Sequence, residues 1–258
     1  MDLKISEQRF IVCGASSGFG LAIAKQLLIE GAVVVAVARR GDQLHELYGN
    51  FKDRVEIIEG SLIYGETLDK IEKSARERPF HGIVLNAGGP PTGTPLQTNM
   101  MDWDAAWQLV MRWKIDLALR LAPLLREKRY GRLLFIESQT VKQPLPSLVL
   151  SNAFRAGIAG FAKSLALEIA PDGVTVNLMA PGSHETPAIE RVIKNNSQTL
   201  GISYEKAKKE LEAKIPVGRM GTAEEFASLA AWLLSPHSSY VTGQTISHDG
   251  GIVAGLFG

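Results

Sequence analysis

The chain has 258 residues, of which 45% are apolar and 21% charged, and its formal net charge is +1. This composition is typical of a globular protein with a sizeable core, and the near balance of charge gives no reason to expect nucleic acid or an anionic membrane as a partner. The single cysteine, Cys13, excludes an internal disulfide framework, and no apolar run approaches the ~20 residues of a membrane span. Since the N-terminus has no signal-peptide pattern, we expect a cytoplasmic protein, and no metal site is predicted.

Short apolar runs rich in β-branched residues recur along the chain. They are continuous rather than alternating, which is typical of parallel strands covered on both faces. Amphipathic stretches lie between them: residues 19–30 end at Gly31, and residues 154–170 end at Pro171. This alternation predicts a single α/β domain, a doubly wound parallel sheet of about seven strands with helices on both faces. The predicted strands are residues 10–12, 33–37, 55–58, 83–85, 133–136, 174–178 and 244–247.

Residues 183–216 are the least regular part of the chain, polar and rich in Lys and Glu. The segment is too long for a simple connection, so we expect a pair of helices laid over the edge of the sheet. It is either a solvated helical insert or a lid over a substrate, and both interpretations stay open at this point.

A glycine-rich segment follows the first predicted strand and opens the first helix. Its glycines, Gly14, Gly18 and Gly20, have the spacing Gly-x3-Gly-x-Gly. Glycine lets the backbone turn tightly and approach a pyrophosphate, and the helix N-terminus offers free N–H groups and a positive dipole end to the phosphates. The segment therefore predicts a dinucleotide site. The expected contacts are Gly14, Ser16, Ser17, Gly18, Phe19 and Gly20.

The second predicted strand is followed by Arg39 and Arg40, where NAD-preferring dinucleotide folds have an acid for the adenosine ribose. A guanidinium can pair bidentately with a 2′-phosphate, which an acid would repel. We therefore expect NADP(H) to be favoured, with NAD(H) as the second candidate. Two solvated loop arginines are the alternative interpretation.

Further motifs carry a resemblance that covers essentially the whole chain. With the glycine segment, they resemble the short-chain dehydrogenase/reductase family, in particular its β-ketoacyl-acyl-carrier-protein reductases. The resemblance implies a Rossmann-type fold, hydride transfer between nicotinamide and a carbonyl or alcohol carbon of a small molecule, and a homodimer or homotetramer. It also implies cofactor contacts from the turn after the fourth strand and from the segment beside the nicotinamide. The motifs are Asn86-Ala87-Gly88, Pro181-Gly182 with Thr186, and residues 215–219, 242–244 and 249–251.

The predicted catalytic helix departs from that family. Family members have a Tyr that exchanges the proton, a Lys four residues later that lowers the Tyr pKa and holds the ribose, and a Ser that orients the carbonyl. Ser138 matches the serine, but Ser151 stands at the Tyr position and Arg155 at the Lys position, which resembles an atypical subgroup with Ser-x-x-x-Arg. Arg155 can still hold the ribose but cannot release a proton, and a serine is a far weaker acid than a phenol. The helix Asn of the family falls near Met111.

Three residues near Ser138 are candidates for the missing proton donor. His184 follows the Pro181-Gly182 turn, and its ordinary pKa of ~6.5 suits proton transfer; a solvent-exposed loop histidine is the alternative. Glu137 is expected to point away from Ser138 along the strand, and Lys142 is expected to be a solvated loop charge. The candidate catalytic set is Ser138, Ser151, Arg155 and His184.

Two functions follow from these patterns. The first is an NADP(H)-dependent oxidoreductase of a ketone, secondary alcohol or 3-oxoacyl group that uses a non-standard proton donor. The second is a catalytically impaired dinucleotide-binding or regulatory protein on the same scaffold. The intact Asn86-Ala87-Gly88 and Pro181-Gly182 turns favour the first, and the replacements at Ser151 and Arg155 favour the second.

Overall fold

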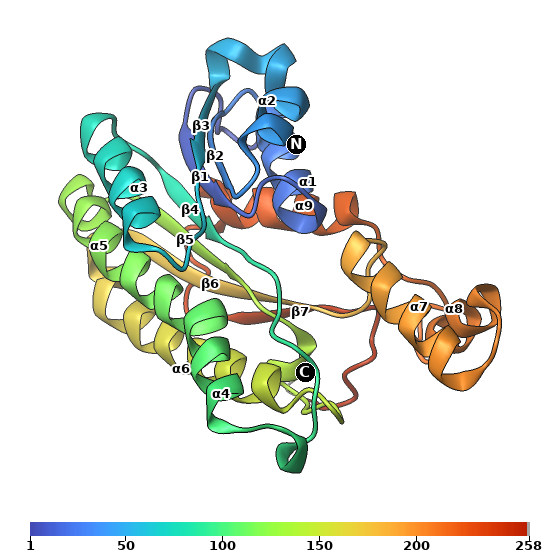
Figure 1. Cartoon of the computed structure of the whole chain (residues 1–258). Coiled ribbons are helices and arrows are strands. Elements are labelled where there is room, and N and C mark those ends of the chain that lie inside the picture. Colours follow the sequence, from blue (N-terminus) through green and yellow to red (C-terminus); the bar gives the residue numbers. More distant parts are fainter. Residues whose placement is uncertain (257–258) are drawn as a thin grey trace.

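The computed structural model describes residues 1–256, and within them seven strands form one parallel sheet (Figure 1). The strand order is β3-β2-β1-β4-β5-β6-β7, so the chain progresses outward in opposite directions from the neighbouring strands β1 and β4. In open sheets of this kind ligands bind outside the carboxyl ends of the strands, at that reversal. The fold class expected from the sequence is confirmed. The strands are β1 (Arg9–Cys13), β2 (Val33–Ala38), β3 (Val55–Glu59), β4 (Gly82–Leu85), β5 (Gly131–Ile136), β6 (Val174–Pro181) and β7 (Thr245–His248).

Helices cover both faces of the sheet (Figure 1). Because side chains alternate along a strand, Phe10 and Val12 of β1 pack on one side, whereas Ile11 and Cys13 pack on the other. Both faces are apolar, which is why the strands are continuously apolar in sequence. The first face is covered by α1 (Gly18–Ile29), α2 (Gly41–Tyr48) and α9 (Ala223–Leu234), and the second by α3 (Gly65–Glu77), α5 (Trp113–Lys128) and α6 (Val149–Ile169).

Helix α5 continues from α4 (Met100–Ala106) through a π-helical turn at residues 107–112. Trp103 and Trp107, which the sequence places at i, i+4 spacing, both contact Phe154 of α6, with ring centroids 5.6 and 6.3 Å apart. A π-turn adds a residue to the helix, so the side chains beyond it are rotated relative to a regular α-helix.

The segment 183–216 contains the expected pair of helices, α7 (Pro187–Leu200) and α8 (Tyr204–Glu212). They extend away from the sheet beyond β7 (Figure 1) and share a small apolar cluster. A lid function for this pair stays a prediction. In the part of the chain that the structure describes, no helix is both long enough and apolar enough to cross a membrane. The buried members of the α7–α8 cluster are Ile193, Ala207, Ile215 and Met220.

Candidate active site

The turn after β1 is built so that only glycine fits at two positions. Gly14 has φ +69°, and a Cβ on it would lie 2.8 Å from both the side-chain nitrogen and the carbonyl oxygen of Asn86. A Cβ on Gly20 would lie 2.2 Å from the Gly14 carbonyl oxygen. Asn86 donates from Nδ2 to the Cys13 carbonyl at 3.3 Å and so ties this turn to the end of β4. The backbone after β1 is therefore as compact as a pyrophosphate cradle requires.

The N-terminus of α1 faces the same turn. Ser17 precedes the helix in extended conformation, and its side chain makes no capping hydrogen bond, so the first-turn N–H groups are available to an anion. The Phe19 ring packs on Phe226, with centroids 4.1 Å apart, and thus anchors the loop. Thr186, which precedes α7, lies next to Gly18: a Cβ on that glycine would be 3.8 Å from the Thr186 methyl group. The uncapped helix end and the glycine turn together fit a dinucleotide pyrophosphate.

Two arginines follow β2 on the adenosine side of this cradle. Arg39 and Arg40 are both exposed, and Arg40 immediately precedes α2 in extended conformation. The Glu59 carboxylate, at the end of β3, lies against Gly41. The position directly after β2, where an acid would hold an adenosine ribose, therefore carries positive charge.

Three candidate catalytic side chains meet at the carboxyl end of β5: those of Ser138, Ser151 and Arg155. Thr140 connects Ser138 to Ser151, and Ser151 contacts Arg155 directly. The Ser138 hydroxyl oxygen accepts the Thr140 N–H at 3.2 Å, and the hydroxyl oxygens of Thr140 and Ser151 are 3.5 Å apart. Arg155 donates from Nε to the Ser151 hydroxyl oxygen at 3.0 Å, because the two residues are one turn apart on α6. Ser151 and Arg155 are buried. The structure thus brings together three of the four candidate catalytic residues.

Two charged residues complete this cluster: Glu137, which the sequence indicated only as a candidate proton donor, and Lys114, which it did not assign. Glu137 accepts from Arg155 Nη1 at 2.8 Å and from the ammonium group of Lys114, which also donates to the Ile136 carbonyl at 3.3 Å. The Glu137 side chain has no exposed surface, and that of Lys114 is 1% exposed. Burial lowers the pKa of Lys114, although the adjacent Glu137 carboxylate opposes this effect. The Glu137 carboxylate thus lies in a buried ionic cluster with Lys114 and Arg155.

His184 is held in a different environment. It is 3% exposed, so the alternative of a solvent-exposed histidine is wrong. Its Nδ1 lies 3.1 Å from the Gly182 carbonyl oxygen and its Nε2 lies 2.8 Å from Nδ1 of His248, while its ring packs against Phe19 and Phe226. Burial lowers the pKa of His184. Both ring nitrogens are thus engaged, and the structure does not bring His184 into the hydrogen-bonded group of Ser138, Ser151 and Arg155.

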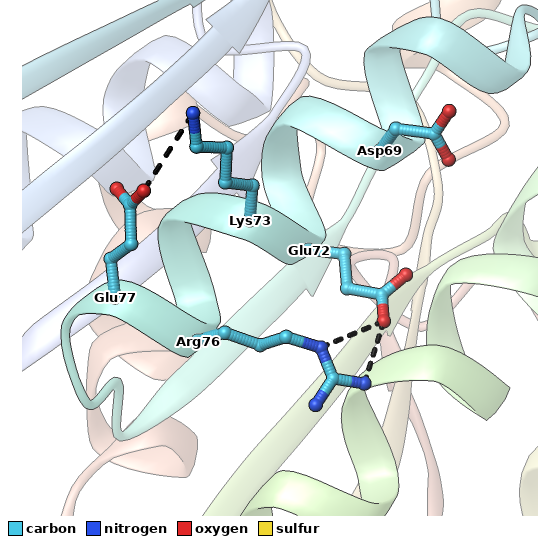
Figure 2. Close-up of a pocket in the computed structure, with 5 residues that line it drawn as sticks. All are labelled: Asp69, Glu72, Lys73, Arg76 and Glu77. Atoms are coloured by element: carbon cyan, nitrogen blue, oxygen red, sulfur yellow. Dashed lines mark hydrogen bonds and ion pairs between the residues drawn. The ribbon is translucent and has the colours of Figure 1, made fainter.

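Two hollows of the described surface lie outside this cluster. One, of about 400 Å³, lies on the outer side of α3, where Arg76 donates to Glu72 and Lys73 pairs with Glu77 (Figure 2). Arg120 of α5 also pairs with Asp69 and Glu72 there, so the charges of this hollow neutralise one another. Another, of about 420 Å³, lies next to the segment after Thr140. Its lining residues are Val141, Lys142, Ala159, Thr245, Val253, Gly255 and Leu256.

Comparison with known proteins places this geometry in a family. A family profile described as enoyl-(acyl carrier protein) reductase matches residues 14–253. The chain belongs to the short-chain dehydrogenase/reductase family of oxidoreductases. It is 32% identical to nodulation protein G of Rhizobium sp. (strain N33), over 96% of this chain and 98% of that protein. It is 28% identical to the NADPH-dependent reductase BacG of Bacillus subtilis (strain 168), over 96% of this chain and 98% of that protein.

A solved structure of a family member shows the same fold. The L-sorbose reductase of Gluconobacter frateurii, complexed with NADPH and L-sorbose, superposes with a TM-score of 0.93 at 30% identity, covering 99% of this chain and 100% of that one. Gly89, directly after Asn86-Ala87-Gly88, lies against Arg155, since a Cβ on it would be 3.2 Å from Nη2. Pro181 closes β6, and Gly182 donates its N–H to the His248 carbonyl at 3.1 Å.

Proposed function

We propose that this chain is an NADP(H)-dependent reductase of the carbonyl group of a ketone or a 3-oxoacyl compound. The observation that carries the proposal is the meeting, at the carboxyl edge of the sheet, of the glycine turn after β1 and a hydrogen-bonded group. In this group Ser138 is partly exposed, whereas Thr140, Ser151 and Arg155 are buried. A cytoplasmic location and a homodimer or homotetramer belong to the same proposal. The family resemblance supports the oligomer, and the single cysteine fits a reducing compartment such as the cytoplasm.

We assign the cofactor by matching the residues of the site to the parts of a dinucleotide that they could contact. The glycine turn and the uncapped end of α1 would hold the pyrophosphate, and Arg39 with Arg40 would pair with a 2′-phosphate. The turn at residues 86–88, the Pro181-Gly182 turn and Thr186 would flank the nicotinamide half. The printed names of BacG and of the L-sorbose reductase complex, which both include NADPH, support the same choice. When bound, NADPH supplies the hydride.

The hydrogen-bond directions in the cluster determine what the serines can do. Arginine is a donor only, so the Ser151 oxygen accepts from Arg155 Nε and the Ser151 hydroxyl hydrogen must point to another acceptor. Likewise the Ser138 oxygen accepts the Thr140 N–H, which leaves its hydroxyl hydrogen free to donate. Two hydroxyl donors can thus bind one carbonyl oxygen. The guanidinium behind Ser151 stabilises the negative charge that develops on that oxygen as the carbon is reduced.

The proton reaches the product through Ser151. As the carbonyl carbon gains hydride, the electron pair of the C=O bond moves to the oxygen, which takes the Ser151 hydroxyl proton, and Ser151 regains a proton from water. His184 is not assigned this role, because both of its ring nitrogens are engaged. Since a serine is a weaker acid than a phenol, we expect turnover roughly 10²- to 10⁴-fold below that of a site with a well-matched general acid.

The test is a screen of ketones and 3-oxoacyl thioesters with NADPH at several pH values, following loss of NADPH absorbance. We expect substrate-dependent oxidation of NADPH that is strongly reduced in Ser138→Ala and in Ser151→Ala. Ser164→Ala is the matched control, because Ser164 is an exposed residue of the same helix whose hydroxyl donates to the Gly160 carbonyl. The double variant Ser151→Tyr with Arg155→Lys is expected to gain activity. Tight NADPH binding without turnover of any compound would contradict the proposal and favour a binding or regulatory protein.

A further inference from the structure

Glu137 is the centre of a buried ionic cluster that joins three elements. It follows β5, Lys114 belongs to α5, and Arg155 belongs to α6. The exposed fractions of the three side chains are 0% for Glu137, 1% for Lys114 and 8% for Arg155. Two cations therefore share one anion next to the residues proposed to bind the carbonyl oxygen.

Stability does not account for this cluster. Moving ions out of water is costly, and replacing a buried ion pair by apolar residues of similar volume is often neutral or stabilising. The neighbouring positions on the inner face of the same helical segment, Val110, Leu117 and Leu121, are apolar and buried, so an apolar residue at position 114 would extend the core. The orientation that the charges impose on Arg155 therefore offers a better account of the cluster than helix packing alone.

The cluster fixes the orientation of the Arg155 guanidinium, which is planar. Nη1 donates to Glu137 and Nε donates to Ser151, so two of its three nitrogens are held. The third, Nη2, lies beside Gly89, where a Cβ would approach it to 3.2 Å. The guanidinium plane is therefore oriented so that Nε faces Ser151. Its Nη2 faces the turn that flanks the nicotinamide half of the proposed cofactor site.

We infer that Glu137 and Lys114 are positioning residues for this reaction. Glu137 fixes the guanidinium plane so that Ser151 accepts from Nε and turns its own hydroxyl hydrogen toward the substrate, and Lys114 holds the Glu137 carboxylate in place. Neither residue touches the substrate in this scheme, which rests on the function proposed above. The cluster does not relay protons, because Arg155 separates Glu137 from Ser151 and an arginine does not release its proton in a protein.

The first experiment compares two glutamates that each pair with a buried arginine. In Glu137→Gln the amide keeps the size of the side chain but accepts from only one of the two cations. We expect kcat and kcat/KM for the carbonyl substrate to fall together, by about 10- to 100-fold, with KM unchanged. The reason is that a misplaced Ser151 hydroxyl weakens the stabilisation of the transition state more than the binding of the substrate. The control is Glu56→Gln, which breaks a 2.7 Å pair with Arg9 at the opposite edge of the sheet. It is expected to lower the unfolding midpoint and leave kcat unchanged.

A second variant separates positioning from folding. Glu137→Gln leaves two buried cations without an anion and so destabilises the chain. The double variant Lys114→Met with Glu137→Gln removes one of these cations, and we expect it to recover stability but not kcat. Recovery of the parental kcat in the double variant, or a parental kcat in Glu137→Gln, would overturn the inference.

A third measurement does not depend on turnover. The Nε–H signal of Arg155 in heteronuclear NMR, assigned by its loss in Arg155→Lys, is expected to exchange slowly with solvent in the parent and in Glu56→Gln, and rapidly in Glu137→Gln. An unchanged signal in Glu137→Gln overturns the positioning role whether or not the chain reduces any carbonyl. Faster exchange in Glu137→Gln, combined with no turnover by the parent, contradicts the proposed function but supports the positioning of Arg155.

Discussion

Replacement of Gly20 by alanine tests the cofactor cradle, because the same change at Gly160 meets no obstacle. The new methyl group at position 20 would lie 2.2 Å from the Gly14 carbonyl oxygen and 2.9 Å from Asn86 Nδ2, so α1 must move relative to β1. Overpacking of this kind costs about 1–3 kcal/mol, against a gain of about 0.5–1 kcal/mol for alanine over glycine inside a helix. The movement withdraws N–H groups from the phosphates. Since hydrogen bonds to charged groups contribute about 1.5–3 kcal/mol each, losing one weakens the Kd for NADPH about 10- to 100-fold.

Gly160→Ala is the matched control. Gly160 lies on the exposed side of α6, and a Cβ there has nothing within 4 Å. We expect this variant to be more stable by about 0.5–1 kcal/mol and to bind NADPH like the parent. Urea unfolding measures the stabilities and isothermal titration calorimetry measures the Kd values. If Gly20→Ala gains stability as Gly160→Ala does and keeps the parental Kd, the close contact between Gly20 and Gly14 does not exist in solution.

Three further predictions concern charge and protonation. Replacing Arg39 and Arg40 together by Glu is expected to weaken NADPH binding about 10-fold or more while sparing NADH, since each charge-assisted hydrogen bond to a phosphate contributes about 1.5–3 kcal/mol; an equal loss for both dinucleotides in calorimetry contradicts this. Burial lowers the pKa of His81 to about 4, so its contribution to stability is fully present above pH ~6.5 and is lost as the pH falls toward about 4. His81→Asn, which retains an acceptor for the Arg9 N–H, should flatten the dependence of unfolding free energy on pH in that window, and an unchanged slope refutes it. Burial also raises the pKa of the Cys13 thiol to about 12, so a thiol reagent should label the unfolded chain but not the native one at neutral pH; rapid labelling of the native chain disproves this.

The cofactor half of the site could be predicted from the sequence because its signals are local. The spacing of Gly14, Gly18 and Gly20 between a strand and a helix requires a tight turn at a helix N-terminus, and the structure has that turn. The doubly wound parallel sheet could be predicted for the same reason, since short β-α connections permit few arrangements. Here the sequence pattern and the structure agree because the contacts of the glycine turn join segments that are close in sequence or that lie on adjacent strands.

The ionic cluster could not be predicted because its members come from three separate elements. The sequence alignment placed the polar residue of the helix near Met111, yet the structure packs Met111 against Gly157, and the buried polar group is Lys114. The π-helical turn just before α5 rotates the following side chains, which a regular helical periodicity does not anticipate. The usable signal was a lysine within the apolar stripe of α5, followed later by a glutamate at the end of an apolar strand. His184 was misjudged for a similar reason: the residues that bury it, Phe226 and His248, lie far from it in sequence.

The two glutamates that pair with buried arginines show how similar interactions can have different consequences in one fold. At the amino end of β1, Arg9 donates to Glu56 and also to the Ser74 and Arg78 carbonyl oxygens, so its donors are used to join β1, β3 and α3. At the carboxyl end of β5, Arg155 directs Nε to the hydroxyl oxygen of Ser151, so the hydroxyl hydrogen of this serine points to a different acceptor, which in the proposed reaction is the substrate. The second cluster also has one more cation than anions, which suits an oxygen that becomes negative during reduction. A chain without the usual phenol can therefore still stabilise such an oxygen, provided that Glu137 holds Arg155 in the orientation that the structure shows.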